Sequence, residues 1–185
     1  MTKLTKTQKM LNVKSSILLI VDIQEKLMPA ISEQEKIISN ITKLITFAEI
    51  VHLPVIYTEQ HKLGPILPEI KAGLSHGELI CKKEFNCFLN DSFRRQIDSS
   101  HISSLIIAGV ETHICISQTA LGAIENYHVH VVSDAVSSRT QENHEIGLAR
   151  MYQSGIVITS IEMVMFELLR TSDSEEFKRA LPLIK

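Results

Sequence analysis

Six short apolar runs rich in β-branched residues recur along the chain, and longer segments of mixed polarity separate them. Runs of this length and composition predict buried β-strands. They occupy residues 16–22, 54–59, 78–82, 104–109, 128–134 and 155–160. Most of the intervening segments place apolar residues three and four positions apart, a spacing that predicts amphipathic helices.

The clearest helical segment extends to residue 50. Its apolar stripe is formed by Ile37, Ile38, Ile41, Leu44, Ile45 and Ala48. Ser32 and Glu35 have the spacing of a capping box, so we expect the helix to begin there.

Two later segments have a similar spacing. Residues 112–127 carry Ile116, Ala120, Ala123, Ile124 and Tyr127, and residues 140–153 carry Ile146, Leu148, Ala149 and Tyr152. Gly155 is a stop signal for the second segment. The stretch 60–77, rich in Gly and Pro, is the one long loop that we expect.

Strands that alternate with helices predict a parallel sheet, because a parallel connection needs a dozen or more residues to return. The fold class is therefore α/β: a three-layer α/β/α domain with a doubly wound, mainly parallel, six-stranded Rossmann-like sheet. We expect one domain over residues 15–185, preceded by a short basic arm at residues 1–14. Ligands bind such sheets beyond the carboxyl ends of the strands.

Cys115 lies just after the fourth predicted strand, near the first turn of the next helix. A thiolate is favoured at helix N-termini and beside cations. Asp22, Glu59, Lys82 or Lys83, and Asp134 end other predicted strands. An aspartate can take the thiol proton, a lysine can stabilise the thiolate, and two backbone N–H groups can bind an oxyanion. These residue types favour amide hydrolysis through a thioester.

Composition narrows the possible partners. The formal net charge is −2, with 44% hydrophobic and 22% charged residues, and this predicts no general attraction to nucleic acid or to anionic membranes. Three cysteines favour reduced thiols and a cytoplasmic protein. Lys3, Lys6, Lys9 and Lys14 mark the arm, which has no apolar core of signal-peptide length.

The segments LLIVDIQEKL, YTEQHKLGPILPEI, KKEFNCF, IIAGVETHICISQTAL and VVSDAVSSRT together resemble the isochorismatase-like cysteine hydrolase superfamily, particularly its isochorismatase domain-containing branch. The resemblance extends from about residue 14 to the end of the chain. It implies that Asp22, Lys82 and Cys115 are the catalytic residues, and that a cis peptide bond joins Val110 and Glu111.

The resemblance also implies an oxyanion hole formed by the N–H groups of Glu111 and Cys115. Gln24, Glu59 and Phe85 would line the substrate pocket. We therefore expect a small-molecule substrate, a homo-oligomer and no cofactor. Nicotinamidases of the superfamily have a metal-binding Asp-x-His segment where this chain has Gln60, so no metal is expected. The thiol argues against a true isochorismatase, and Asn86 stands where serine is usual.

Several residues also have structural interpretations. His113 could be a catalytic base, but a loop or cap histidine is favoured because Asp22 fits that role better. His128 and His130 share a strand face without a third ligand and are interpreted as structural.

Cys81 is expected in the strand core and Cys87 in packing. Arg139 could bind substrate beside Asp134, although a turn and N-cap role for Ser138 or Thr140 is equally favoured.

Two other functions remain to be weighed against a cysteine hydrolase. A catalytically idle member of this fold would serve as an interaction module. A nucleotide-binding protein is disfavoured because the chain contains neither G-x-G-x-x-G nor G-x-x-x-x-G-K-[ST].

Overall fold

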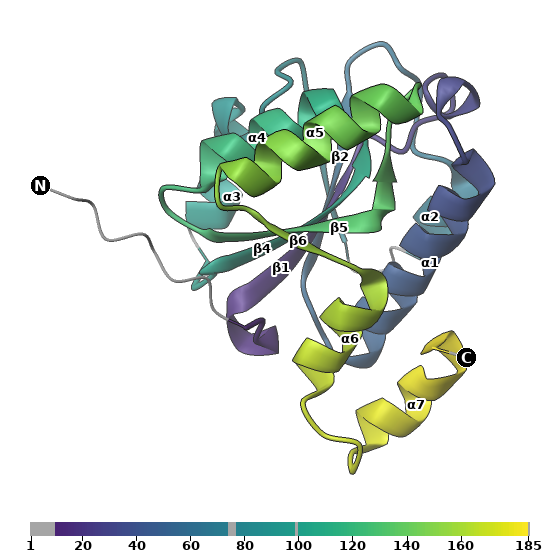
Figure 1. Cartoon of the computed structure of the whole chain (residues 1–185), viewed down its shortest axis with the longest axis vertical. Coiled ribbons are helices and arrows are strands. Elements are labelled where there is room, and N and C mark those ends of the chain that lie inside the picture. Colours follow the sequence, from purple (N-terminus) through teal and green to yellow (C-terminus); the bar gives the residue numbers. More distant parts are fainter. Residues whose placement is uncertain (1–9, 74–76, 99, 185) are drawn as a thin grey trace, which may run out of the picture.

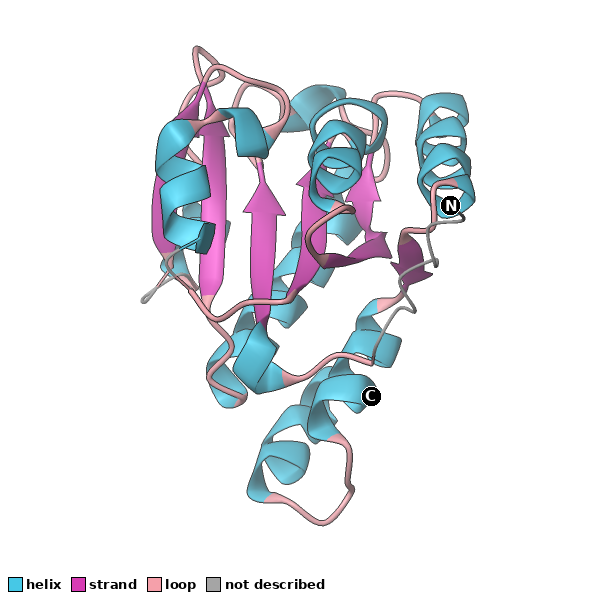
Figure 2. Ribbon diagram, turned by 90° about the vertical axis from the view of Figure 1, so that its left-hand side faces the viewer, coloured by secondary structure: helices cyan, strands magenta, loops and turns pink. Residues whose placement is uncertain are grey.

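The structure, a computed structural model, describes residues 10–73, 77–98 and 100–184. Six strands form one sheet in the order β3-β2-β1-β4-β5-β6, and every pair of neighbours is parallel (Figure 2). The strands are β1 Ser16–Val21, β2 Val55–Gln60, β3 Glu78–Lys82, β4 Ser104–Val110, β5 His128–Ser137 and β6 Val157–Thr159. The predicted α/β fold class is confirmed.

Helices cover both faces of the sheet (Figure 1). They are α1 Gln34–Ile50, α2 Pro68–Ala72, α3 Asp91–Asp98, α4 Ser117–Ala123, α5 Gln141–Gln153, α6 Ile161–Leu169 and α7 Glu175–Ile184. Apolar residues of α1, α2, α6 and α7 belong to one core cluster, and those of α3, α4 and α5 belong to the other. The two faces of β1 contribute to different clusters, and all six of its residues are buried. A central strand buried on both faces explains the uninterrupted apolar run in the sequence.

The predicted capping box is wrong. Helix α1 begins at Gln34, and its N-cap is Glu33, which has a left-handed backbone and no side-chain cap hydrogen bond. Ser32 Oγ donates instead to the carbonyl oxygen of Arg139, at 3.0 Å. A partner from a distant segment has displaced the local cap.

The predicted apolar face of α5 is also wrong except at Leu148, which packs against the core. Ile146 is 56% exposed and Tyr152 is 71% exposed, whereas Gly147 and Met151 are buried. The helix packs through its glycine, because a Cβ at Gly147 would lie 3.1 Å from the Cα and N atoms of His113. The apolar pattern could not predict this contact, because the contact depends on Gly147 having no side chain.

Other predicted boundaries also shift. The segment expected as a long loop contains α2, and the segment expected as a helix from residue 112 begins with a π-helical turn, Thr112–Ile116, and continues as α4. Strand β5 extends to Ser137, three residues beyond the predicted end, and its register with β4 shifts between Ile107 and Gly109. Gly155 follows α5 with φ +87°, as expected of a stop signal.

The predicted arm is described only from residue 10. Leu11 is fully buried, and its N–H donates to Glu167 Oε2 at 2.9 Å. Arg170 donates to the carbonyl oxygen of Leu11 at 3.3 Å. The chain is therefore fixed to α6 before the expected boundary at residue 14, while Lys3, Lys6 and Lys9 lie outside the described residues. In the described part of the chain, no helix is both long and apolar enough to cross a membrane.

Candidate active site

Three predicted residues meet at the carboxyl edge of the sheet. Asp22 directly follows β1, Lys82 ends β3, and Cys115 lies in the π-helical turn between β4 and α4. Lys82 Nζ lies 2.6 Å from Asp22 Oδ2 and 3.7 Å from Cys115 Sγ. Their exposures are 0% for Asp22, 2% for Lys82 and 7% for Cys115. A carboxylate, an ammonium and a thiol therefore form one buried cluster.

Two backbone positions near the carboxylate of Asp22 have positive φ angles. Asp22 itself has φ +55°, a conformation that costs a non-glycine residue about 1 kcal/mol or more. In the neighbouring strand, Gly109 has φ +116°, and a Cβ there would lie 2.2 Å from the carbonyl oxygen of Val21. Gly109 thus allows β4 to approach β1 closely, immediately before the carboxylate that faces Lys82.

The register of the edge strand selects one of the two adjacent lysines. Side chains alternate along a strand, and in β3 both Ile80 and Lys82 are buried. Lys83 follows on the opposite side and is exposed. Of the two lysines that the sequence left open, Lys82 is therefore the one that faces the thiol, and it is the one that the resemblance implies.

Burial determines how the thiol titrates. It raises the pKa of Cys115, the charge of Asp22 raises it further, and Lys82 opposes both effects without overcoming them. The expectation of a lowered pKa for Cys115 is therefore wrong, because the sequence displays the nearby cation but not the loss of solvent. At neutral pH Cys115 is a thiol, and it needs a base.

Lys82 remains a cation in the same environment. Burial alone would lower its pKa, but the charge of Asp22 and the hydrogen bond to Asp22 raise it. Asp22 is fixed from its other side by Thr58, whose Oγ1 donates to Asp22 Oδ1 at 2.6 Å. Thr58 was missed in the sequence, because its place beside Val21 follows from the register of β1 with β2, which the sequence does not show.

Two glutamines stabilise this edge of the sheet. Gln24 is fully buried; its Oε1 accepts the N–H of Gln60 at 2.8 Å, and its Nε2 donates to the carbonyl oxygens of Gln60 and Gly64. Gln60 Oε1 accepts a hydrogen bond from Lys82 Nζ at 2.6 Å. Gln24 thus fixes the backbone after β2, and Gln60 contacts the cluster directly.

The peptide bond between Val110 and Glu111 is cis, as the resemblance implied. The carbonyl oxygen of Glu111 accepts the N–H groups of Ile114 and Ile116, at 3.0 and 3.2 Å. Its side chain is buried and accepts both the Nε and the backbone N–H of Arg139, each at 3.0 Å. The turn that carries Cys115 is thereby tied to the end of β5.

Other expected site residues lie apart from this cluster. Glu59 accepts the N–H of Ile66 at 2.9 Å and lies 3.8 Å from Cys81 Sγ, on the side of β2 opposite Gln60. Cys81 is exposed, so its expected place in the strand core is wrong, whereas Cys87 is buried as expected. Phe85 is 53% exposed.

Three polar residues that the sequence analysis singled out have structural partners. Asp134 lies within β5, and its Oδ1 accepts the N–H of Ile161, the first residue of α6, at 3.0 Å. Thr140 is the N-cap of α5, as one of the two interpretations held. Asn86, which replaces the usual serine, caps the short turn Cys87–Leu89.

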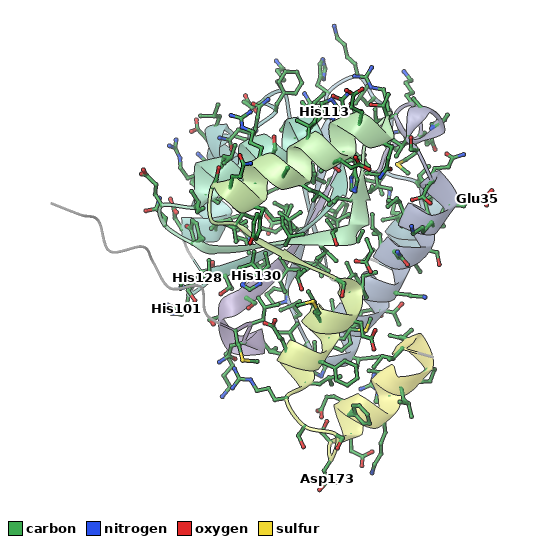
Figure 3. The ribbon with its side chains drawn as sticks, viewed as in Figure 1. Glu35, His101, His113, His128, His130 and Asp173 are labelled. Carbon is green, nitrogen blue, oxygen red and sulfur yellow. The ribbon has the colours of Figure 1, made fainter. Side chains whose placement is uncertain are left out.

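Figure 3 shows His113 far from His101, His128 and His130. His113 Nδ1 forms a hydrogen bond of 2.9 Å with Ser138 Oγ, which favours its structural interpretation. His128 and His130 are buried and lie near the amino ends of the strands, away from His113. Among the residues that the structure describes, no group of three or more His, Cys, Asp or Glu side chains could hold a metal ion.

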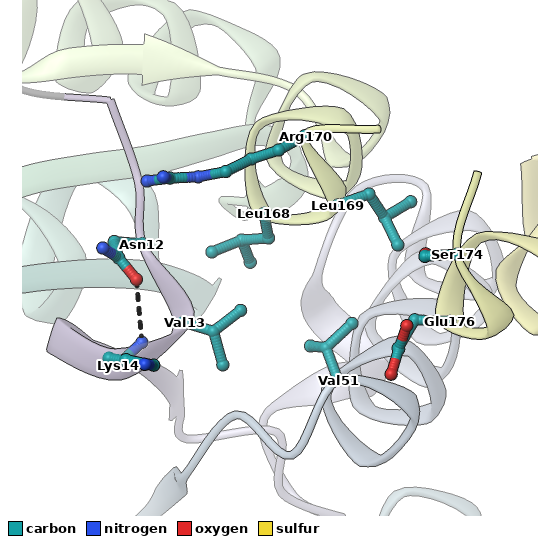
Figure 4. Close-up of a pocket in the computed structure, with 9 residues that line it drawn as sticks. All are labelled: Asn12, Val13, Lys14, Val51, Leu168, Leu169, Arg170, Ser174 and Glu176. Atoms are coloured by element: carbon teal, nitrogen blue, oxygen red, sulfur yellow. Dashed lines mark hydrogen bonds between the residues drawn. The ribbon is translucent and has the colours of Figure 1, made fainter. Parts of the chain in front are cut away.

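A cavity of about 460 Å³ opens at the amino edge of the sheet, opposite Cys115 (Figure 4). Its walls come from the turn Val13–Ser15 and from the ends of α1, α6 and α7. A smaller cavity of about 210 Å³ lies beside the cluster and is lined by His61, Cys81, Lys82, Lys83, Glu84 and Asn90. Only the smaller one includes a residue of the cluster.

Known proteins are similar to this chain in both sequence and fold. The chain is 34% identical to isochorismatase domain-containing protein 2A of Mus musculus over 93% of its length and 84% of that protein. A structure described as the MAR1 ribonuclease of Caenorhabditis elegans superposes with a TM-score of 0.89 at 32% identity, covering 94% of this chain and 91% of that one.

Two bacterial YcaC structures superpose equally well, each with a TM-score of 0.89. The protein from Pseudomonas aeruginosa, described with hexane-2,5-diol and covalent acrylamide, is 28% identical and covers 96% of this chain and 93% of its own. The protein from Escherichia coli, described as an octameric hydrolase of unknown specificity, is 29% identical and covers 97% of this chain and 91% of its own. The family model described as the isochorismatase domain matches residues 16–163. The chain therefore belongs to the isochorismatase family.

Proposed function

We propose that this protein is a cysteine-dependent hydrolase of a small amide or related acyl compound, with Asp22, Lys82 and Cys115 as its catalytic residues. The observation that carries the proposal is the position of Lys82 Nζ, 2.6 Å from the carboxylate and 3.7 Å from the thiol within one buried cluster. Family membership supports hydrolysis in general, and the cluster supports the more specific chemistry.

In the first half-reaction, Asp22 takes the proton of Cys115, and the thiolate attacks the carbonyl carbon of the amide. Lys82 stabilises the thiolate while this charge exists. The N–H groups of Glu111 and Cys115 bind the oxyanion of the tetrahedral intermediate. When the C–N bond breaks, protonated Asp22 gives its proton to the leaving amine, and a thioester to Cys115 remains.

In the second half-reaction, Asp22 takes a proton from water as the water attacks the thioester. Breakage of the C–S bond releases the carboxylic acid, and Cys115 recovers its proton. The raised pKa of Cys115 suits this sequence because a resting thiol keeps its proton until a substrate is in place, and Asp22 is positioned to accept that proton.

The comparisons suggest two features beyond the reaction. The covalent acrylamide described for the Pseudomonas aeruginosa neighbour supports a nucleophile that reacts with a small amide-bearing electrophile. The octamer described for the Escherichia coli neighbour supports a homo-oligomer here. A cytoplasmic location stays a prediction.

Hydrolysis of small amides, including nicotinamide and N-carbamoyl compounds, would test the proposal with wild type and Cys115→Ala. We expect turnover by wild type, none by a folded Cys115→Ala variant, and an acyl adduct on Cys115 by mass spectrometry. Turnover should also survive exhaustive chelation, because Gln60 Oε1 is already bound to Lys82.

The same screen should include an RNA, since one structural neighbour is described as a ribonuclease. Cleavage of RNA that persists in Cys115→Ala would contradict the proposal. A wild-type protein that neither turns over an amide nor labels at Cys115 with acrylamide would favour an interaction module instead.

A further inference from the structure

Gln60 contacts the candidate catalytic cluster, although its position in the sequence marks it only as the place of a missing metal ligand. It ends β2 directly opposite Lys82 in the parallel register. Its Oε1 accepts Lys82 Nζ at 2.6 Å, and its Nε2 donates to the carbonyl oxygen of Lys83 at 2.8 Å. Both ends of the amide group are therefore bonded, one to the last residue of β3 and the other to the residue after it.

These two bonds determine which way the amide faces. A flipped amide would place its NH₂ group against the ammonium and its oxygen against a carbonyl oxygen, so both contacts would become repulsive. The backbone of Gln60 is fixed as well, because Gln24 bonds to both its N–H and its carbonyl oxygen. Gln60 thus presents an acceptor of fixed position to Lys82.

This acceptor completes the coordination of the ammonium. A lysine ammonium has three donors, and the hydrogen-bond partners of Lys82 Nζ are Asp22 Oδ2, Gln60 Oε1 and Cys115 Sγ. With two donors held at 2.6 Å by oxygens, the third is directed at the sulfur. The contact between Lys82 and the thiol therefore depends on the other two partners.

The neutrality of Gln60 also matters to the charge of the cluster. Asp22 and Lys82 carry opposite charges and Cys115 is neutral; after the thiol proton moves to Asp22, the thiolate and Lys82 carry opposite charges and Asp22 is neutral. The cluster is thus neutral before and after proton transfer, which suits a site without solvent. An acid at position 60 would leave one negative charge uncompensated in both states.

We propose that Gln60 is a positioning residue: its neutral amide holds Lys82 against Cys115 and keeps a second carboxylate away from the buried cluster. The inference rests on the proposed function only in taking Cys115 as the nucleophile. The groups that act electrostatically on Cys115 are Asp22 from β1, Lys82 from β3 and Cys87 from the turn that follows it.

The test is the rate of Cys115 alkylation by acrylamide as a function of pH, resolved by mass spectrometry, in the full-length protein. For Gln60→Glu we expect a rate at least about tenfold lower than wild type at each pH from about 7 to 9, since a nearby like charge disfavours the thiolate by roughly 1 to 3 pKa units. Gln60→Met adds no charge but removes the acceptor, and it should also slow alkylation.

Gln118→Glu is the matched control. Gln118 is exposed and lies three residues after Cys115, so the same change of charge occurs close by but in solvent. Its rate should stay within about twofold of wild type at each pH, because solvent and salt screen the added charge. A Gln60→Glu profile that coincides with the control, or a Gln60→Met rate equal to wild type, would overturn the inference.

Alkylation also separates this inference from the proposed function. If wild type hydrolyses no amide but the Gln60 variants slow alkylation as stated, the inference stands and the proposed function fails. If Gln60→Glu does not fold, the rate of Gln60→Met decides the question.

Discussion

Replacing Gly147 by alanine sets two opposing effects against each other. Gly147 lies within α5, where alanine is intrinsically better than glycine by about 1 kcal/mol. Against this, the new Cβ would lie 3.1 Å from both the N and Cα atoms of His113, and 3.2 Å from the carbonyl carbon of Thr112. These are backbone atoms of the turn that carries Cys115, so they cannot move aside as a flexible side chain would.

We expect the close contacts to outweigh the helical preference. Overpacking a close-packed interface costs roughly 1 to 3 kcal/mol, so the net change in unfolding free energy should be a loss of about 1 kcal/mol. In a chain of this size, such a loss lowers the melting temperature by about 2 to 4 °C. The turn must also shift by a few tenths of an ångström, and alkylation of Cys115 should become slower.

Urea unfolding and acrylamide labelling measure the two effects separately. Ala149→Gly is the matched control, because Ala149 is an exposed residue of the same helix and reports the helical preference alone. It should lose about 1 kcal/mol and leave labelling unchanged. If Gly147→Ala were instead more stable than wild type by about 1 kcal/mol, the close approach of α5 to the turn would be refuted.

Two further predictions concern buried titratable groups. Lys82→Met should destabilise the protein by about 3 to 5 kcal/mol, because it leaves Asp22 buried without its counter-charge. Lys83→Met should change the stability by less than about 0.5 kcal/mol. Urea unfolding of both variants measures these changes, and a larger loss in Lys83→Met would contradict the placement of the two lysines. Burial raises the pKa of Cys87 from 9.0 to about 11, so the folded protein holds this proton more tightly than the unfolded chain does. The resulting stabilisation of the folded state is complete below pH 9 and is lost as the pH rises through 11. The destabilisation caused by Cys87→Ala should therefore shrink by about 2 kcal/mol between about pH 8 and pH 11, and a constant difference over that range would contradict the shift.

The strands could be predicted from the sequence because a strand that is buried on both faces consists of a continuous run of apolar residues. In β1 the five residues after Ser16 are all apolar, as expected of a central parallel strand, and the polar residue that follows the strand lies at the ligand-binding edge. Asp22, Lys82 and Cys115 could be brought together in the same way, since each stands at or just beyond the end of a recognisable strand.

What could not be predicted depends on tertiary partners. Ser32 has the sequence of a helix cap, but its hydroxyl bonds to Arg139, 107 residues away. The pKa of Cys115 depends on burial, which local sequence does not reveal. Gln60 could be recognised as a departure from a metal site, yet its contact with Lys82 follows only from the register of β2 with β3.

The strand order has a consequence for synthesis of the protein. Strand β1 lies between β2 and β4, and its partner β4 begins only at Ser104, more than 80 residues after β1 ends. While a nascent chain emerges from the ribosome, β1 to β3 can pair, but the backbone N–H and C=O groups along one edge of the apolar strand β1 stay unpaired until β4 follows. Unpaired strand edges of this kind promote aggregation. The interval between the synthesis of β3 and β4 is therefore when a nascent chain most needs a chaperone, and a thiol-reactive reagent specific for the assembled site can report only after that interval has passed.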